Sequence, residues 1–152
     1  GALGDERGGL AFDLYAGVGL FTLPLSKRFE RVISVEDKRR AATLGRVNVK
    51  SNGCDNVHYL RKTTEQFLDA NTEQPDLVLM DPPRLGAKPA LGRLLKLRPR
   101  RLVYVSCDPV TLARDLRTLV DGGYRLEQVE AFDMFPQTFH VEAVGRLARV
   151  EP

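Results

Sequence analysis

The sequence is poor in the residues that would place it in several large classes of protein. Its 152 residues include two cysteines, two histidines and two methionines, and no tryptophan. Cys54 and Cys107 lie far apart in different surroundings, which fits neither a disulfide framework nor the paired ligand spacing of a metal site. We therefore expect a protein of a reducing compartment, the cytoplasm, without a metal centre.

Long apolar runs are also missing. The longest have the length of a strand and are interrupted by charges, whereas a membrane-spanning helix needs roughly 20 apolar residues. The start of the chain, Gly1 to Gly9, is glycine-rich and charged and lacks the basic and then apolar pattern of a signal peptide. With 43% hydrophobic residues and no low-complexity tract, the sequence predicts one globular domain over residues 1–152.

The net charge of +3 is modest, but the charges are unevenly placed. No acidic residue occurs between Arg84 and Arg101, while the basic residues there are Arg84, Lys88, Arg93, Lys96, Arg98, Arg100 and Arg101. A local excess of this kind neutralises phosphates, so the run is a candidate contact with a nucleic acid. The alternative is a solvated helix face, with Arg98 to Arg101 at the edge of the sheet away from the ligand crevice.

Apolar runs of strand length alternate with segments of helical pattern. The strands are predicted at Leu10–Leu14, Val32–Val35, Val57–Leu60, Leu77–Met80, Leu102–Val105, Leu126–Phe132 and Thr138–Val150. The helices are predicted at Leu20–Lys27, Lys38–Ser51, Thr64–Asp69, Pro89–Leu97 and Pro109–Val120. This alternation indicates a doubly wound α/β fold, with a mostly parallel seven-stranded sheet covered on both faces. The short link Asp133–Gln137 between the last two strands predicts an antiparallel C-terminal hairpin.

A glycine-rich turn follows the first predicted strand. Gly17 and Gly19 let the backbone turn tightly and approach a ligand. Dinucleotide-binding enzymes carry a third glycine, and Thr22 occupies that position, which counts against NAD. Glu36 follows the second strand, where an acidic side chain suits the hydroxyls of a ribose. These features favour an adenosyl ligand without a pyrophosphate, S-adenosyl-L-methionine. The alternative for Glu36 is a charge that complements a helix dipole.

Two prolines follow Asp81 directly after the fourth predicted strand. Prolines interrupt a strand and the start of a regular helical turn, so they hold an extended loop with the Asp81 carboxylate at the strand end. A charge fixed there is useful, because ligands of open α/β sheets bind outside the carboxyl ends of the strands. The plainer interpretation is that the prolines end the strand and that Asp81 caps the next helix.

Cys107 stands where the fifth predicted strand stops and a helical pattern begins. Asp108 is the predicted N-cap of that helix and Pro109 its first residue. A thiol at a helix N-terminus feels a field that favours its anion, although an ionised Asp108 opposes this, so Cys107 is a candidate nucleophile. The alternative is a small buried hydrophobic side chain, since free cysteines are commonly buried and inert.

A candidate base lies in the predicted hairpin. His140 and Glu142 share one face of the last strand, because side chains two residues apart align. Phe135 and Phe139 lie nearby in the sequence and are candidate supports for a nucleobase. A carboxylate in such surroundings can serve as a general base. The alternatives are that the aromatic residues belong to the core of the hairpin and that the charges guard an edge strand against aggregation.

Together these segments resemble the RNA 5-methyluridine (uracil-C5) methyltransferases, which have the Rossmann-like fold of class I S-adenosylmethionine-dependent enzymes. The resemblance runs from Asp13 to about Arg149. Its specific pieces are Asp13-Leu14-Tyr15-x-Gly17-x-Gly19-x-Phe21-x-Leu23, Asp81-Pro82-Pro83-Arg84-x-Gly86, Tyr104-Val105-Ser106-Cys107-x-Pro109-x-Thr111-Leu112-Ala113-Arg114-Asp115, and Asp133-x-Phe135-Pro136-x-Thr138-x-His140-Val141-Glu142. Four such motifs in this order are strong grounds for the resemblance.

The resemblance implies methylation of uridine C5 in tRNA or 23S rRNA, with Cys107 as the nucleophile and Glu142 as the general base. The cofactor contacts that it implies are Tyr15, Gly17, Gly19, Leu20, Glu36, Thr63 and Asp81. The family usually has Asn where this sequence has Asp108. Family members also carry an N-terminal RNA-binding β-barrel domain that this sequence lacks, so we expect the chain to be the C-terminal catalytic part of a longer protein; the alternative is a minimal homologue.

Two other functions stay open at this point. One is a non-catalytic module of the same fold that binds the cofactor or RNA, in which Cys107 is merely structural. The other is a methyltransferase that acts on amino nitrogens, for which an acidic residue followed by two prolines after the fourth strand is suggestive. This second function leaves Cys107 unused.

Overall fold

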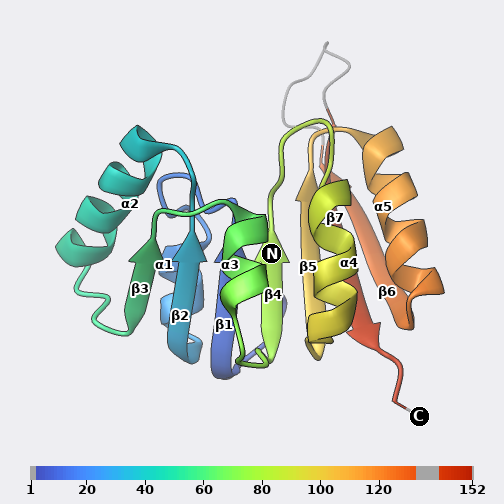
Figure 1. The fold of residues 1–152 in the computed structure, drawn as a ribbon, viewed down its shortest axis with the longest axis horizontal. Coiled ribbons are helices and arrows are strands. Elements are labelled where there is room, and N and C mark those ends of the chain that lie inside the picture. Colours follow the sequence, from blue (N-terminus) through green and yellow to red (C-terminus); the bar gives the residue numbers. More distant parts are fainter. Residues whose placement is uncertain (1–2, 133–140, 152) are drawn as a thin grey trace.

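A computed structural model describes residues 3–132 and 141–151, in which strands and helices alternate (Figure 1). The strands are β1 (Gly8–Leu14), β2 (Phe29–Val35), β3 (Val57–Leu60), β4 (Leu77–Met80), β5 (Arg101–Ser106), β6 (Tyr124–Phe132) and β7 (Glu142–Arg149). The helices are α1 (Thr22–Ser26), α2 (Arg39–Ser51), α3 (Thr64–Ala70), α4 (Lys88–Leu97) and α5 (Pro109–Asp121). The predicted link Asp133–Gln137, with Phe135, and the predicted residues Phe139 and His140 lie outside the described residues.

The strands form one seven-stranded sheet in the order β3-β2-β1-β4-β5-β7-β6. Strands β1 to β5 pair in parallel, while β7 pairs antiparallel with both β5 and β6. The predicted fold class and the antiparallel pairing at the C-terminal end are therefore confirmed. The strand order reverses between β1 and β4, and this is the point at which open α/β sheets bind their ligands.

The helices cover both faces of the sheet because the strands bury side chains on both sides. Phe12 and Leu14 face the apolar cluster that includes side chains of α3, α4 and α5, and Phe12 meets Phe67 edge to face with ring centres 4.9 Å apart. Ala11 faces the opposite cluster, which includes Leu25 of α1. Strand β4 is buried along its whole length, as expected of a central strand between two helical layers.

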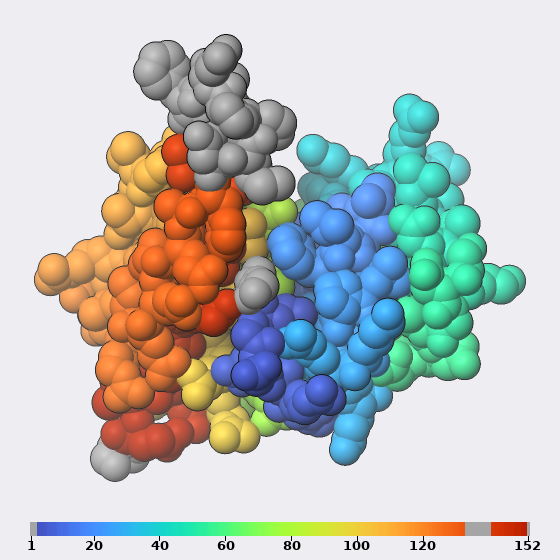
Figure 2. Space-filling model, turned by 180° about the vertical axis from the view of Figure 1, so that it is seen from behind, coloured from blue at the N-terminus to red at the C-terminus, as the bar shows by residue number. Residues whose placement is uncertain are grey.

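The back of the molecule is partly covered by the N-terminal segment (Figure 2). Leu3 is 6% exposed and packs into the same apolar cluster as Val103 of β5 and Val144 of β7. Within the described ranges, no helix has the length and apolar character needed to cross a bilayer.

Helix α1 is shorter than predicted and begins at Thr22 instead of Leu20. The preceding Gly19 has a φ of 95°, a left-handed conformation that keeps this segment in a turn, and Leu20 is 72% exposed. The other described boundaries lie close to the prediction. Where the predicted start also lies among the described residues, the largest difference is at β2, which begins at Phe29 instead of Val32 because it pairs with β1 from its first residue. Strand β7 begins at Glu142, and its predicted start at Thr138 lies outside the described residues.

Candidate active site

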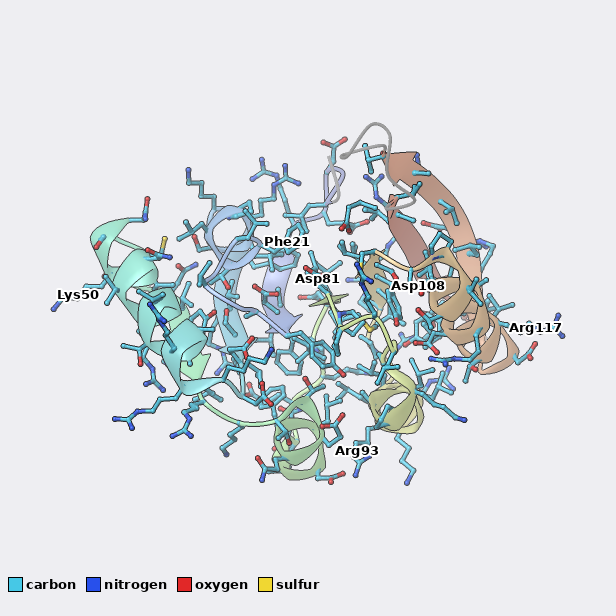
Figure 3. The ribbon with its side chains drawn as sticks, turned by 90° about the horizontal axis from the view of Figure 1, so that it is seen from above. Phe21, Lys50, Asp81, Arg93, Asp108 and Arg117 are labelled. Carbon is cyan, nitrogen blue, oxygen red and sulfur yellow. The ribbon has the colours of Figure 1, made fainter. Side chains whose placement is uncertain are left out.

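The predicted site residues come together at the carboxyl edge of the parallel strands, which Figure 3 shows from above. Each follows a different strand, in the order Tyr15 after β1, Glu36 after β2, Thr63 after β3, Asp81 after β4 and Cys107 after β5. A pocket of about 460 Å³ opens at this edge. Its lining consists of Tyr15, Gly17, Val35, Glu36, Asp37, Lys38, Ala41, Thr63, Thr64, Glu65, Asp81, Pro82 and Pro83.

The glycine turn and Glu36 form one unit at the pocket. Tyr15 and Gly17 adopt left-handed conformations, with φ of 59° and 58°. The Gly17 N–H donates to Glu36 Oε2 at 2.8 Å and the Lys38 N–H donates to Glu36 Oε1 at 2.9 Å. A carboxylate has about four lone-pair sites, so Glu36 keeps acceptor capacity for hydroxyls of a ligand. It both fixes the turn and lines the pocket.

Tyr59 supports the glycine turn from below, a role that the sequence patterns missed. Its hydroxyl donates to the Gly17 carbonyl at 2.7 Å, and its ring is 8% exposed. Helix α2 comes close to this ring at Gly45, where an added Cβ would lie 2.3 Å from Tyr59 Cζ. The contact joins residues of three separate elements, so no local sequence signal reveals it.

Asp13 is a second residue whose role the sequence patterns missed. It is 1% exposed at the end of β1, and its Oδ2 accepts a 2.5 Å hydrogen bond from the Thr22 hydroxyl, which lies 2.9 Å from the Ser34 hydroxyl. Asp13 Oδ1 has no hydrogen-bond partner among the described residues. Burial raises the pKa of Asp13 to about 7, so this carboxyl is partly protonated at neutral pH. The sequence signal that could have revealed this role is an acidic residue inside an otherwise apolar strand.

Asp81 lies at the rim of the pocket. Removal of its carboxyl from bulk water, followed by the charge of Glu142, raises the pKa of Asp81 to about 6. The alternative that Asp81 caps the next helix is wrong, because α4 has Ala87 at its N-cap and no side-chain cap. Thr63 does cap a helix, since its hydroxyl accepts from the Gln66 N–H at 3.1 Å, and it also lines the pocket.

The structure does not bring every predicted cofactor contact to the pocket. Gly19 and Leu20 are not among the lining residues. Gly19 forms the turn that precedes α1, and the exposed Leu20 side chain faces solvent, because the helix begins two residues later than predicted.

Cys107 is half-buried at the point where β5 gives way to α5. Asp108 Oδ1 accepts hydrogen bonds from the N–H groups of Val110 at 2.9 Å and Thr111 at 3.0 Å, so the predicted N-cap is confirmed, as is Pro109 at the first turn. The Thr111 N–H is the main cause of a lowered pKa at Asp108. An ionised carboxylate therefore stands next to the Cys107 thiol at neutral pH.

Glu142 lies beside Cys107 at the same edge. In the antiparallel ladder of β5 and β7, Ser106 pairs with Ala143, which places the following Cys107 next to the preceding Glu142. The charge of Glu142 also contributes to the raised pKa of Asp81, as expected of two carboxyl groups at the same edge of the sheet. Asp81 thus follows β4, Cys107 follows β5 and Glu142 begins β7, and these three strands are neighbours in the sheet.

The charge of the pocket lining is mainly negative. Its acidic residues are Glu36, Asp37, Glu65 and Asp81, and Lys38 is the one basic residue among the lining side chains. A pyrophosphate would be repelled by such a lining, whereas a ligand with positive charge would be attracted.

The predicted basic run does not form a single surface. Arg93 pairs with Asp69 at 2.7 Å, and Arg101 pairs with Glu6 and Glu127. Arg98 and Arg100 directly precede β5 and so lie at the amino edge of the sheet, as the alternative interpretation expected. Within this run only the segment at Arg84 and Lys88 follows β4 on the side of the pocket.

A second basic group, which the sequence analysis missed, lies beside the pocket. We call Lys38, Arg39, Arg40, Arg61 and Lys62 the edge cations. They are exposed and follow the adjacent ends of β2 and β3, where the Glu36 N–H donates to the Leu60 carbonyl at 3.1 Å. None of the ion pairs among the described residues uses them. Their proximity depends on strand pairing, so it is not visible in sequence order.

Comparisons with known proteins agree with this geometry. A sequence model of the family described as tRNA (uracil-5-)-methyltransferase matches residues 2–150. An uncharacterized RNA methyltransferase from Thermotoga maritima is 44% identical over 141 residues, which cover 92% of this chain and 32% of that protein. The 23S rRNA (uracil(1939)-C(5))-methyltransferase of Aeromonas salmonicida is 41% identical over 146 residues, covering 94% of this chain and 33% of that protein.

A solved structure gives the same result. The tRNA (uracil-54, C5)-methyltransferase of Pyrococcus abyssi, in complex with S-adenosyl-L-homocysteine, superposes with a TM-score of 0.82 at 36% identity, covering 93% of this chain and 35% of that one. The chain spans about a third of the length of these relatives. On the strength of a family match over nearly all of its residues, the chain belongs to the tRNA (uracil-5-)-methyltransferase family.

Proposed function

We propose that this chain is the catalytic part of an enzyme that methylates C5 of uridine in tRNA or 23S rRNA, with S-adenosyl-L-methionine as the methyl donor. The observation that carries the proposal is the meeting of Cys107, Glu142 and Asp81 at one edge of the sheet, beside an acidic pocket. Relatives with about 40% identity are named as methyltransferases of 23S rRNA, and a structural relative acts on tRNA, so both substrates stay within the proposal.

The pocket fits the proposed cofactor. When bound, S-adenosyl-L-methionine supplies an electrophilic methyl group on a positively charged sulfonium. The lining acids Glu36, Glu65 and Asp81 complement that charge. The free acceptor sites of Glu36 suit the hydroxyls of a ribose, and the left-handed turn at Tyr15 and Gly17 lets the backbone approach the ligand.

Cys107 would act as the nucleophile. Uracil C5 is too weak a nucleophile to take a methyl group unaided. When the Cys107 thiolate bonds to C6, the electron pair of the C5–C6 double bond moves into an enolate, and C5 becomes nucleophilic. C5 would then form a bond to the methyl group while the bond from that group to sulfur breaks, which leaves the electron pair on sulfur and S-adenosyl-L-homocysteine as the product. The position of Cys107 at the end of β5, one strand from Asp81, supports this role.

Glu142 would remove the proton that C5 still carries. Once that proton is taken, its electron pair restores the C5–C6 double bond and the Cys107 thiolate leaves C6, which regenerates the enzyme. Glu142 directly precedes Ala143, which pairs with Ser106 just before Cys107, and this closeness supports Glu142 as the base.

RNA binding is supported by the distribution of basic side chains. The edge cations lie on one side of the pocket and Arg84 and Lys88 lie on the other, after β4. Phosphates of an RNA strand can be neutralised on both sides while one base enters between them. Because C5 and C6 are covered in a stacked base, the target uridine must be unpaired or turned out of its helix.

Transfer of a labelled methyl group from S-adenosyl-L-methionine to RNA tests the proposal. The RNA is digested to nucleosides after the reaction, and we expect the label in 5-methyluridine and none with Cys107→Ala. Cys54→Ala, at the other free cysteine, is the matched control and should stay active. Label on exocyclic amino groups, with Cys107→Ala still active, would instead identify a methyltransferase of amino nitrogens.

A further inference from the structure

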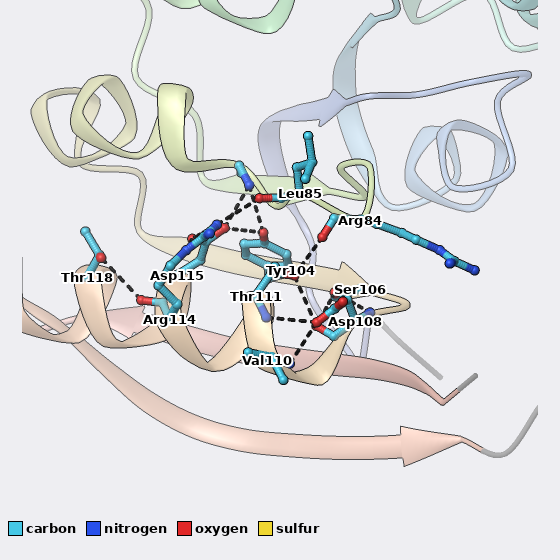
Figure 4. Close-up of polar contacts among 11 residues, drawn as sticks. Arg84, Leu85, Tyr104, Ser106, Asp108, Val110, Thr111, Arg114, Asp115 and Thr118 are labelled. Carbon is cyan, nitrogen blue, oxygen red and sulfur yellow. Dashed lines mark hydrogen bonds and ion pairs between the residues drawn. The ribbon is translucent and has the colours of Figure 1, made fainter. Parts of the chain in front are cut away.

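The loop that follows Asp81 is tied to helix α5 by a buried polar network (Figure 4). Asp115 is completely buried, and its Oδ2 accepts from the Tyr104 hydroxyl at 2.6 Å and from the Ala87 N–H at 2.7 Å. The other oxygen, Oδ1, accepts from Arg114 Nε at 2.9 Å. Tyr104 belongs to β5, Asp115 to α5, and Ala87 ends the loop, so one carboxylate joins three parts of the fold.

Two further hydrogen bonds connect the same helix and loop. The Thr111 hydroxyl donates to the Arg84 carbonyl at 3.0 Å, and an Arg114 Nη donates to the Leu85 carbonyl at 2.9 Å. We call Tyr104, Thr111, Arg114 and Asp115 the loop clamp. It holds the loop backbone at Arg84, Leu85 and Ala87.

The contact between loop and clamp is close. Gly86 has a φ of 83°, and an added Cβ there would lie 2.5 Å from an oxygen of Asp115 and 2.6 Å from an Arg114 nitrogen. A side chain at this position would push the loop away from the carboxylate. The hydrogen bonds of Asp115 with Tyr104 and Ala87 are shielded from water, and breaking one leaves a buried polar group unpaired, so this part of the clamp resists displacement.

The clamp connects the loop at the cofactor pocket with the helix that follows the proposed nucleophile. One end of the clamped loop carries Asp81 and two prolines at the cofactor pocket, while α5 begins just after Cys107. No residue of the clamp lines the pocket itself. We propose that the loop clamp consists of positioning residues that fix the Asp81 loop relative to Cys107, and so align the methyl donor with the base held by the thiolate. This inference rests on the proposed function.

The proposal predicts how a loosened clamp changes the kinetics of methyl transfer. Transfer requires the methyl group and the activated C5 in line and nearly in contact, and a misplacement of about 1 Å can cost on the order of 100-fold in rate. A loosened clamp should therefore lower kcat. It should change the affinity for S-adenosyl-L-methionine little, because most of the residues that line the pocket lie outside the clamped loop.

Two variants open the clamp without replacing a residue that lines the pocket, and each has a matched control. Tyr104→Phe removes the hydroxyl that bonds Asp115, and Tyr124→Phe removes an equally buried hydroxyl that bonds the Pro99 carbonyl at 2.7 Å, at the far edge of the sheet. Thr111→Val removes the bond to the Arg84 carbonyl. Thr118→Val removes a bond from the same helix to its own Arg114 carbonyl.

We expect Tyr104→Phe and Thr111→Val each to lower kcat by about tenfold or more, with the Kd for S-adenosyl-L-methionine within about twofold of wild type. The two controls should keep kcat near the wild-type value, even where Tyr124→Phe destabilises the fold as much as Tyr104→Phe. Equal losses of kcat in variants and controls would overturn the proposal, as would unchanged kcat in both clamp variants.

Amide hydrogen exchange tests, independently of activity, whether the clamp couples the loop to α5. In the wild type, the Ala87 amide should exchange slowly, and binding of S-adenosyl-L-homocysteine should further protect both the loop and the first turn of α5. Tyr104→Phe should confine that added protection to the loop. If added protection reaches α5 equally in Tyr104→Phe and Tyr124→Phe, the clamp does not couple the two parts. A wild-type protein that methylates no RNA would contradict the proposed function, while this exchange result would still stand.

Discussion

At the scale of single residues, the site depends on acidic groups in contrasting surroundings. Asp13 is buried beneath the glycine turn with a pKa raised to about 7, and Asp81 at the pocket rim has a pKa raised to about 6. Asp108, held by the N–H groups of α5, has a lowered pKa. Near neutral pH, Asp13 is therefore only partly ionised, whereas Asp108 carries its full charge beside Cys107.

The buried carboxyl of Asp13 should make stability depend on pH. Its pKa in the folded state, about 7, lies above the ordinary value of 3.8, so the folded protein binds this proton more tightly than the unfolded chain. The stabilisation is complete below about pH 4 and is lost as the pH rises to about 7. Asp13→Asn keeps an acceptor for Thr22 and should remove this loss, which is on the order of a few kcal/mol.

Chemical unfolding of wild type and Asp13→Asn between pH 4 and 8 measures the difference. We expect the free energy of unfolding of the variant to rise relative to wild type as the pH increases. Asp69→Asn is the matched control: the hydrogen bond from Arg93 lowers the pKa of Asp69 below its ordinary value of 3.8, so its difference from wild type should stay constant between pH 4 and 8. A difference between Asp13→Asn and wild type that stays constant across the pH range would show that Asp13 is not buried in the manner described.

Asp108 should restrain the reactivity of Cys107. Its negative charge disfavours formation of the adjacent thiolate, while Asn would keep the capping acceptor without the charge. We expect Asp108→Asn to react severalfold faster with iodoacetamide at Cys107 at a given pH. Cys54 in the same protein serves as the internal control. An unchanged pH profile of Cys107 alkylation would refute this role of Asp108.

At the scale of elements, the pocket depends on contacts between segments that are distant in sequence. The glycine turn after β1 is held by Glu36 at the end of β2 and by Tyr59 of β3, and α2 packs on Tyr59 at Gly45. The position of the turn is therefore coupled to the distance between α2 and β3.

Two helical glycines test this coupling. Gly45→Ala places a methyl group 2.3 Å from a ring that is 8% exposed and cannot move into solvent. We expect a loss of about 1–3 kcal/mol in the free energy of unfolding, together with weaker binding of S-adenosyl-L-methionine as the Tyr59 hydroxyl leaves Gly17. Gly92→Ala on α4 meets no atom within 4 Å and should stabilise the protein by about 0.5–1 kcal/mol with unchanged binding. Unchanged stability of Gly45→Ala would contradict the close packing.

The elements themselves were largely predictable, because their signals are local. The apolar runs predicted the strands, and Asp108 followed by Pro109 predicted the start of α5. The predicted start of α1 at Leu20 was wrong because the turn at Gly19 continues past Leu20. The burial of Asp13, the support from Tyr59 and the role of Asp115 escaped prediction, since each arises from packing between distant segments.

At the scale of the whole molecule, the sheet separates two basic regions. The edge cations lie at the carboxyl edge of β2 and β3, whereas Arg98 and Arg100 precede β5 at the amino edge. The sequence order suggested a single basic run from Arg84 to Arg101, but strand direction divides it. Only the carboxyl edge adjoins the pocket, so we expect RNA to bind there.

Paired substitutions at the carboxyl and amino edges test whether RNA binds at the carboxyl edge. Arg39→Gln with Arg40→Gln should weaken RNA binding across sequences and reduce the slope of log affinity against log salt concentration by about 1.4, for two phosphates on a single strand. Arg98→Gln with Arg100→Gln is the matched control and should leave the slope unchanged. If the control pair lowers the slope as much as the first pair, RNA does not bind at the carboxyl edge alone.

Covalent capture by 5-fluorouridine RNA tests the central claim most directly. Fluorine at C5 leaves no proton for Glu142 to remove, so the bond between Cys107 and C6 should persist after methyl transfer. Incubation with S-adenosyl-L-methionine and 5-fluorouridine RNA, followed by intact-mass analysis and peptide mapping, should yield an adduct on Cys107 and none with Cys107→Ala. An adduct on Cys54, or no adduct from a protein that methylates uridine-containing RNA, would contradict the account.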